Sequence, residues 1–393
     1  MIFEEIENLE ANCTGCAACV DACPTNAIEF VEQKGGFLHP KIKSDKCIGC
    51  GKCSSVCPLK TQKKNEQKQQ LFSAIAKNEE SRLSGSSGGV FGLLAKLCLE
   101  QGYYVCGAVL ENLVLKHKII DNEKDLPKML KSKYIQSNML GVYNEIKELL
   151  KNGNKVFFCG TPCQVSALKN SVGQELSKNL LTADIICHGV PSQKIFDLYI
   201  ESLEKKHGEK VQSFDFRVKN NRYKHAHGFR YIIKNEKRER VINGIYTQSS
   251  FYNAFKKYII FREGCYNCEY ATLNRVSDIT LGDFWGIEKY QKGSNTDKGV
   301  SMVITNTEKG VEYFRAIKQE LDVQEYPLDY GVKLNHCLTN KTKKPELRDQ
   351  VINDLSDYGY DYASKKYFSV GIKHKLYWLI PPFLRSTIRN LRG

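Results

Sequence analysis

Two short runs of cysteine constrain this chain more than any other feature of its sequence. Each run has the spacing C-x2-C-x2-C-x3-C and is followed at once by a proline, Pro24 or Pro58. The cysteines of the two runs are Cys13, Cys16, Cys19 and Cys23, then Cys47, Cys50, Cys53 and Cys57. Two residues between ligands let one tight loop wrap three corners of a cube, while the fourth cysteine reaches a second cube. The repeat therefore predicts two [4Fe-4S] clusters with crossed ligands.

The crossing decides which cysteines share a cluster. We assign one cluster to Cys13, Cys16, Cys19 and Cys57, and the other to Cys47, Cys50, Cys53 and Cys23. Zinc is the alternative metal for paired C-x2-C elements, but zinc sites rarely use eight cysteines in two such runs. We therefore expect residues 1–60 to form an α+β ferredoxin-like domain of the bacterial type, which stores and relays single electrons.

Composition limits the classes of protein to consider. The chain has 393 residues, of which 41% are hydrophobic and 26% charged, a balance typical of soluble globular proteins. It lacks an apolar signal sequence and any run of about 18 apolar residues, so we expect a cytoplasmic location. In that compartment 16 cysteines indicate metal or redox chemistry rather than disulfides. Two clusters with thiolate ligands lower the formal charge from +14 to about +10, and we expect no nucleic-acid partner.

The remainder of the chain divides into three stretches. Residues 61–70 are polar and aperiodic, which predicts a linker. Residues 71–345 alternate between strand-like and helix-like patterns, which predicts an α/β domain. A Gly/Ser loop at 84–89 opens an apolar helix, where unpaired N–H groups either receive a phosphate or form a plain helix cap. Residues 346–393 are expected to form a basic and aromatic C-terminal tail.

Four cysteines outside the two runs lie at strand ends or in a tight pair. An apolar strand leads into Gly160, Thr161 and Pro162, so that Cys163 falls in the first turn of a helix, where the helix dipole favours a thiolate. The other three are Cys187, at the end of the next strand, and the C-x2-C pair Cys265 and Cys268. Converging ligands and ordinary buried thiols are both compatible with this pattern. Cys98 and Cys106 are expected in the core, and Cys337 is expected to be incidental.

These segments together resemble the coenzyme F420 hydrogenase/dehydrogenase beta-subunit family. The segments that carry the resemblance are SGSSGG (84–89), KSKYIQS (131–137), FFCGTPCQ (157–164), ICHGVPS (186–192), REGCYNCEYA (262–271), SDITLGDFWG (277–286) and DKGVS (297–301). The resemblance implies a flavin-binding α/β domain with FAD and a further [4Fe-4S] cluster. The implied ligands of that cluster are Cys163, Cys187, Cys265 and Cys268. The implied flavin contacts are Ser87, Gly88, Gly89, Lys133, Tyr134, Gly160 and Thr161.

Three polar residues have alternative interpretations. Lys133 provides a cation beside the flavin or its pyrophosphate, or is a solvated lysine of a basic run. His188 and Asp283 are the candidates for proton handling, because flavin reduction couples electrons to protons. His188 is otherwise a hydrogen-bonded residue at a strand end, and Asp283 caps a turn. The family includes reductases that do not use coenzyme F420, so the family name does not identify the substrate.

The leading hypothesis is an FAD-dependent iron–sulfur oxidoreductase that passes electrons between a redox protein partner and a small-molecule two-electron substrate. The expected partner is ferredoxin-like or a hydrogenase/dehydrogenase subunit, and a homo-oligomer is compatible with the sequence. The alternative is an electron-transfer subunit of a larger redox complex with no small-molecule substrate of its own. The aromatic and basic residues of 367–393 favour either peripheral binding to a membrane or a packing arm.

Overall fold

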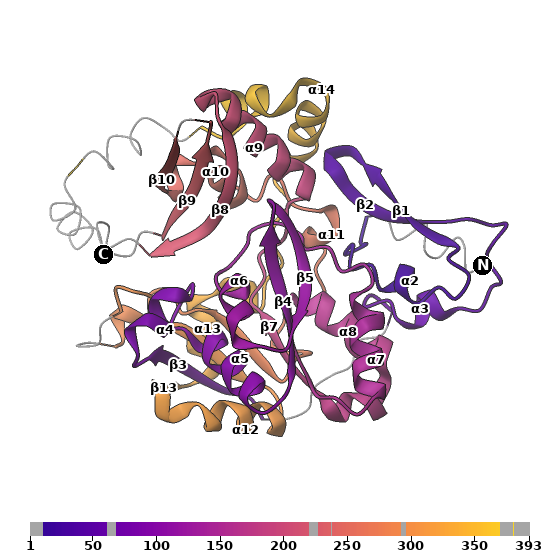
Figure 1. Cartoon of the computed structure of the whole chain (residues 1–393), viewed down its shortest axis with the longest axis vertical. Helices are drawn as coiled ribbons and strands as arrows, with labels where there is room; N and C mark the ends of the chain where they lie inside the picture. The colour runs from indigo at the N-terminus through magenta and orange to yellow at the C-terminus, as the bar shows by residue number, and fades with distance from the viewer. Residues whose placement is uncertain are drawn as a thin grey trace.

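The chain folds into an N-terminal segment, a large sheet domain and a smaller sheet packed beside it (Figure 1). This computed structural model describes residues 11–60, 68–219, 227–236, 238–291, 296–369 and Ile380. All sixteen cysteines are free thiols rather than disulfides. Within the described ranges, no helix has the length and apolar character needed to cross a membrane.

The N-terminal segment, residues 11–60, contains one β-hairpin and two very short helices. Its elements are α2 (Ala18–Asp21), β1 (Ile28–Gln33), the 3-10 turn η1 (Lys34–Gly36), β2 (Phe37–Ile42) and α3 (Lys52–Ser55). The two strands pair antiparallel, with Ile28 opposite Ile42. Gly49 and Gly51 in the second cysteine run have φ values of +66° and +72°. Glycine adopts this left-handed conformation without strain, which lets the loop turn back on itself.

The large sheet has eight strands in the order β13-β3-β12-β11-β7-β6-β4-β5. The central strands β4 (Tyr104–Glu111), β6 (Val156–Gly160), β7 (Leu180–Ile185) and β11 (Ile279–Asp283) run parallel to one another. The flanking strands β5 (Val114–Ile120), β12 (Ser301–Thr305), β3 (Gln70–Ala76) and β13 (Leu321–Tyr326) pair antiparallel with their neighbours. The expected α/β class is confirmed as a mixed α/β domain, with parallel strands only at the centre of the sheet.

Helices cover both faces of this sheet. One face packs against α5 (Val90–Glu100) and α12 (Glu308–Ala316), and the other against α7 (Val142–Lys151), α8 (Pro162–Leu176) and α13 (Leu328–Leu334). Short helices α4 (Glu79–Ser84) and α6 (Leu126–Met129) lie near the edges. The strands β6 and β7 are almost wholly buried, which explains the apolar sequence of β6. As expected, the helix after the Gly/Ser loop and the helix that starts at Pro162 both follow directly from their loops.

The smaller sheet is antiparallel and belongs to a second hydrophobic core. Its strands are β8 (Lys210–Lys219), β9 (His227–Lys234) and β10 (Glu239–Ile245). They pack with α9 (Gln193–His207), α10 (Ser250–Lys256) and α14 (Arg348–Tyr367) around a core rich in aromatic residues. Between α10 and β11 lies α11 (Glu263–Tyr266), which carries Cys265. The smaller sheet thus has a hydrophobic core of its own, distinct from those of the large sheet.

The N-terminal segment packs firmly onto α7 and α8. Cys16 and its neighbours Ala17 and Ala18 share a hydrophobic core with both helices. The Tyr143 hydroxyl donates to the Cys16 carbonyl oxygen at 2.9 Å, and the Asp21 carboxylate accepts from the Gly141 N–H at 2.8 Å. These contacts hold the first cysteine run against the large domain.

The expected boundaries at 70 and 345 differ from those of the structure. Residues 61–67 of the expected linker lie outside the described ranges, and β3 begins at Gln70. Residues 348–367, expected at the start of a tail, form α14, whose apolar side chains enter the second core. The reason is their apolar spacing, which buries Val351, Ile352 and Leu355 together. Nearly all of the proposed membrane-binding or packing segment, 367–393, lies outside the described residues.

The burial of α14 predicts that its core face contributes to stability. Leu355 is 2% exposed and Tyr358 on the same helix is 65% exposed. Leu355→Ala should lower the free energy of unfolding by about 2–4 kcal/mol, because it leaves a cavity. Tyr358→Ala should change it by less than about 0.5 kcal/mol. Urea titration of both variants tests this, and equal effects would contradict the packing of α14.

Candidate functional site

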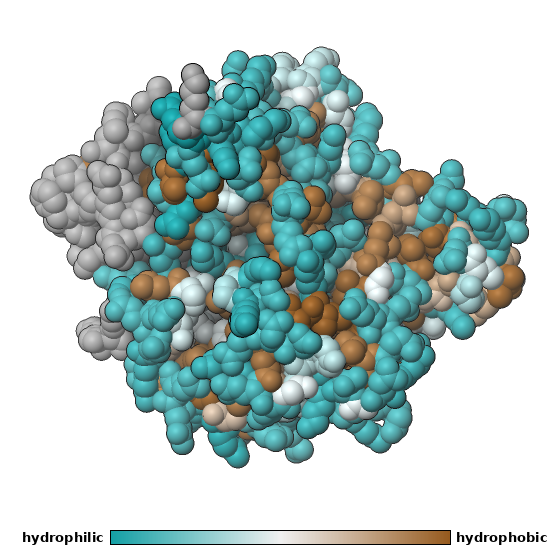
Figure 2. All heavy atoms as spheres, in the orientation of Figure 1, coloured by the Kyte–Doolittle hydropathy of each residue, from teal (hydrophilic) through white to brown (hydrophobic). Residues whose placement is uncertain are grey.

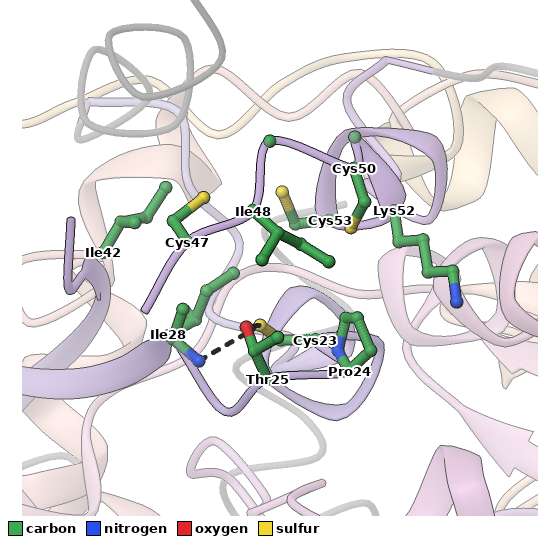
Figure 3. Close-up of a pocket in the computed structure, with 13 residues that line it drawn as sticks. Cys23, Pro24, Thr25, Ile28, Ile42, Cys47, Ile48, Cys50, Lys52 and Cys53 are labelled. Atoms are coloured by element: carbon green, nitrogen blue, oxygen red, sulfur yellow. Dashed lines mark hydrogen bonds between the residues drawn. The ribbon is translucent and has the colours of Figure 1, made fainter. Parts of the chain in front are cut away.

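Four cysteines from both runs surround a small hollow in the N-terminal segment. We call them the outer group: Cys23, Cys47, Cys50 and Cys53. Figure 3 shows the three cysteines of the second run on one loop, with Cys23 approaching from the first run. Ile28 and Ile42 close the hollow on its apolar side, and the Ala27 N–H donates to the Cys23 sulfur at 3.2 Å. The two runs therefore meet here in the crossed manner that the spacing predicts.

A second set of sulfurs lies deeper, against the large domain. We call it the middle group: Cys13, Cys16, Cys19 and Cys57. Burial raises the pKa of Cys16 to about 12, and the nearby Cys13 and Cys57 thiols raise it further. Burial likewise raises the pKa of Cys57, to which Cys13 adds. Cys57 of the second run is thus a close neighbour of the first run. The other three cysteines of the second run belong to the outer group.

The third set comes from three separate parts of the large domain. We call it the inner group: Cys163, Cys187, Cys265 and Cys268. Burial raises the pKa of Cys187, and the neighbouring Cys265 and Cys268 raise it further. Parallel pairing of β6 with β7 sets Cys159 opposite Ala183, so both strands end at the same edge and deliver Cys163 and Cys187 there. The structure thus brings together four thiols from three separate parts of the sequence.

One electrostatic expectation for this group meets an opposing effect. The helix dipole was expected to favour a thiolate at Cys163, at the start of α8. Burial instead raises the pKa of Cys163 well above its usual value, with Cys187 and Cys16 adding to the effect. Desolvation opposes the dipole because burial disfavours the charged form of a thiol. A thiolate at this position needs a bound cation to stabilise it.

The spacing of the thiols bears on the kind of metal they suit. Among the described residues, no three His, Cys, Asp or Glu side chains are placed to hold a metal ion. A single zinc ion draws its ligands to within about 2.3 Å of one point. In a four-iron cube each thiolate instead binds a different iron, so the sulfurs surround a larger space. The ligand role of the twelve cysteines stays a prediction.

The three groups follow one another from the surface inward. Cys19 of the middle group packs with Cys23, Cys47 and Cys53 of the outer group around Ile28 and Ile42. Cys16 is close enough to Cys163 to raise its pKa. The middle group therefore adjoins both of the others.

The Gly/Ser loop lies between strand β3 and strand β12. The Ser87 hydroxyl donates to the Val300 carbonyl oxygen at 2.6 Å, and the Gly88 N–H donates to the Ser301 hydroxyl at 2.9 Å. A Cβ atom on Gly88 would overlap the Ala74 carbonyl oxygen, so the loop requires glycine there. Gly89 precedes α5 in the left-handed conformation, with φ +94°. Because Ser301 already takes the Gly88 N–H, that group does not face a phosphate in this arrangement.

Cationic side chains from elsewhere in the chain gather around this loop. Lys219 donates to the carbonyl oxygens of Arg82 and Ser87. Burial lowers the pKa of Lys219 to about 7, and the positive charges of Arg82 and Arg217 lower it as well. Two of these cations, Arg217 and Lys219, come from β8. The sequence alone did not identify them as candidates. Alternation of apolar and charged residues at 214–219 predicts such a charged face but not its position beside the loop.

Lys133 is neither solvated nor directed at the Gly/Ser loop. Its ammonium donates to the carbonyl oxygens of Ala108, Met129 and Leu130 at 2.8–2.9 Å. Burial lowers the pKa of Lys133 to about 7. The side chain lines a cavity of about 230 Å³, together with Ser132. The alternative of a solvated lysine is therefore wrong, because these carbonyl groups bind the ammonium.

Tyr134 and Asp283 are joined by an arginine that the sequence reasoning missed. Arg217 donates to the Tyr134 hydroxyl at 2.9 Å and to both Asp283 oxygens, at 2.7 and 3.2 Å. Burial opposes the charge of Arg217, but the Asp283 carboxylate outweighs it and raises the pKa of the guanidinium. Arg217 also donates to the Ser86 carbonyl oxygen at 3.0 Å. Asp283 thus serves as the counter-ion of Arg217, which makes it a poor candidate for proton handling.

His188 lies beside the inner group with two residues from near the end of the large domain. Its Nδ1 atom is 3.3 Å from the Cys337 sulfur, which is 3.4 Å from His336 Nε2. Burial lowers the pKa of His188, so the imidazole is neutral near pH 7. Burial raises the pKa of Cys337 to about 11. Cys337 was expected to be incidental, and it instead contacts the histidine that we singled out.

Gly160 and Thr161 lie beside Cys163 of the inner group and not in the Gly/Ser loop. The Thr161 hydroxyl is 3.1 Å from the Cys163 sulfur, and its N–H donates to Gln164 Oε1 at 2.9 Å. Cys98 and Cys106 are buried in the core, as expected. The expected flavin residues thus divide between the Gly/Ser loop, the cavity beside Lys133 and the inner group.

Comparison with known proteins adds family matches to this geometry. Residues 12–61 match the model of the 4Fe-4S dicluster domain. Residues 153–329 match the model described as the C terminus of the beta subunit of coenzyme F420 hydrogenase/dehydrogenase. No curated protein matches the chain.

Solved structures also resemble the chain. One of them is a chain of the F420-reducing [NiFe] hydrogenase complex from Methanosarcina barkeri, 18% identical, with a TM-score of 0.43. The match covers 75% of this chain and 90% of that one. This similarity is distant. From the two family matches, residues 153–329 are similar to the C-terminal part of the beta subunit of coenzyme F420 hydrogenase/dehydrogenase, and residues 12–61 are similar to a 4Fe-4S dicluster domain.

Proposed function

We propose that this protein is an iron–sulfur flavoprotein that passes electrons between a redox protein and a small-molecule substrate. The observation that carries the proposal is the convergence of Cys163, Cys187, Cys265 and Cys268 next to the middle group. Four half-buried thiols next to the residues that match a dicluster domain are the donor set of a further cluster. The outer, middle and inner groups then form a route for single electrons through the protein.

Electrons enter or leave this route at the outer group. Cys50 is exposed, and Ile48 on the same loop is 67% exposed. Figure 2 shows hydrophobic surface over the N-terminal domain, at the right of the view. An exposed apolar side chain beside a cluster suits contact with a second redox protein. The partner that we propose is a ferredoxin-like protein or another subunit of a redox complex.

The Gly/Ser loop and its cations fit the phosphate groups of FAD. Lys219 is bonded to two neutral carbonyl groups beside the loop, so its charge remains available to an anion. The cavity of about 230 Å³ beside Lys133 adjoins the loop, because the Ser132 N–H donates to the Ser86 hydroxyl at 2.6 Å. Bound FAD would supply the exchange between two-electron and one-electron chemistry.

Proton handling falls to His188 in this proposal. It is neutral, lies next to the inner group in sequence and contacts the Cys337 thiol. A neutral imidazole accepts a proton at one nitrogen while donating from the other. Asp283 instead keeps Arg217 charged and in place between Tyr134 and Ser86.

An electron-transfer subunit without a small-molecule substrate is the second candidate. The cavity of about 230 Å³ favours it, because it is smaller than the ~300–1,000 Å³ of typical ligand pockets. Both candidates use the same clusters and both fit a cytoplasmic protein, where the free thiols of this chain persist. They differ in whether a small molecule reduces the flavin directly.

Iron content tests the three-cluster arrangement. Anaerobically purified protein should hold about twelve iron atoms per chain, four for each cluster. Cys268→Ser should lose about four of these, because it removes one ligand of the inner group. Cys98→Ser, at a buried core thiol, is the matched control and should keep all of them. About eight iron atoms in the unsubstituted protein would exclude the third cluster.

The phosphate site predicts a pH dependence of flavin binding. Lys219 has a pKa of about 7 in the free protein, and a bound pyrophosphate should raise it. Binding then takes up a proton, so the Kd for FAD should rise above pH 7, by at most tenfold per pH unit. Lys219→Met should bind FAD more weakly and without this slope, whereas Lys333→Met, at an exposed ion pair, should behave as the unsubstituted protein. An unchanged slope in Lys219→Met would contradict the assignment.

Direct reduction separates the two candidate functions. The FAD-loaded protein is mixed anaerobically with a panel of two-electron donors, including reduced coenzyme F420, a quinol and a nicotinamide. The proposed enzyme predicts that one of them bleaches the flavin absorbance with no protein partner present. Bleaching only after a reduced ferredoxin is added would favour the electron-transfer subunit. Protein that binds no flavin under any of these conditions would overturn the proposal.

A further inference from the structure

Arg262 lies in the seam between the dicluster domain and the large domain. It directly precedes α11, which Figure 1 shows beside strand β2. Only 2% of its surface is exposed. Its guanidinium donates to Gln136 Oε1 at 2.8 Å and to the Leu38 carbonyl oxygen at 3.0 Å. The third contact is with His39 Nε2 at 3.1 Å.

None of these partners carries a negative charge. Burial and the positive charge of Arg262 lower the pKa of His39 to about 4, so its imidazole is a neutral acceptor. The ion pairs of the described residues include the neighbouring Glu263 with Arg348, but none that involves Arg262. A buried cation without a counter-charge strongly disfavours folding. The seam therefore requires negative charge from another source.

Sulfur atoms from two groups supply the nearest candidates. The side chains that act most strongly on the charge of Arg262 are Cys13, Cys265, Cys16 and Cys163. Two belong to the middle group and two to the inner group. As thiols they are neutral, whereas as cluster ligands they are thiolates around a core whose net charge is negative.

The surrounding backbone is shaped to admit this guanidinium. Gly15, in the loop between Cys13 and Cys16, has φ +64°, and a Cβ atom there would lie 2.5 Å from Arg262 Nη2. Gln136 accepts from Arg262 through its oxygen and donates through its nitrogen to the Thr14 and Gly15 carbonyl oxygens, at 2.9 and 3.0 Å. Arg262 and Gln136 thus clamp the first cysteine loop to the large domain.

We propose that Arg262 is the shared counter-ion of the middle and inner clusters and a positioning residue for electron transfer between them. Its positive charge stabilises the extra negative charge that each cluster gains on reduction. The two clusters therefore have higher reduction potentials than they would have without it. The outer cluster, on the far side of the middle group, does not contact Arg262. This inference rests on the proposed third cluster.

The test is a potentiometric titration of the full-length protein with dithionite, followed by EPR. In Arg262→Gln, the midpoint potentials of the middle and inner clusters should both fall, while that of the outer cluster stays unchanged. Gln136→Met removes the clamp without removing charge and should leave all three potentials nearly unchanged. Lys344→Gln removes a half-buried cation that pairs with Glu263 and serves as the control for net charge.

The outcomes separate this inference from the proposed function. Iron content is measured first, and about eight atoms per chain in the unsubstituted protein would refute the third cluster itself. With about twelve atoms present, unchanged potentials in Arg262→Gln would overturn the role of Arg262. If Arg262→Gln fails to retain its clusters, Arg262→Lys provides the second test. Lysine keeps the positive charge but not the planar guanidinium contacts, so this variant should retain its clusters with potentials close to those of the unsubstituted protein, and loss of the clusters in Arg262→Lys as well would overturn the role of the charge.

Discussion

Burial of sulfur is the constraint on which the rest of this structure depends. Cys16, Cys163 and Cys187 lie where desolvation raises the pKa of each thiol well above its usual value. Such sites are unfavourable for thiolates unless a cation is bound among them. The large domain accepts this arrangement at the edge where β6 and β7 end, and the dicluster domain is packed against the same place.

The packing between the two domains follows from that arrangement. A relay of single electrons works only if its centres are close, and a domain joined by a loose linker would not keep them so. Tyr143 and Asp21 fix the first cysteine loop onto α7, and Arg262 with Gln136 closes the seam from the other side. The structure makes the seam itself part of the proposed route.

The local spacing of residues was sufficient to identify the two cysteine runs and to predict the strand–loop–helix units, because the residues that define each of them lie close together in the sequence. The inner group was beyond such reasoning, since it depends on the parallel pairing of β6 with β7 and on the position of α11. Arg217 and Arg262 were missed for the same reason: their partners, such as Ser86 and Leu38, lie more than a hundred residues away in the chain. The start of α14 was mistaken for a tail because tyrosines and charged residues mask its apolar face.

The central claim is that three iron–sulfur clusters follow one another from the exposed loop at Ile48 to the end of β6. Anomalous diffraction at the iron absorption edge from anaerobically grown crystals tests it most directly, because it locates iron without assuming which cysteines bind it. The account predicts three four-iron peaks, one within each of the outer, middle and inner groups. Two peaks confined to the dicluster domain, with Cys163, Cys187, Cys265 and Cys268 free of iron, would contradict it.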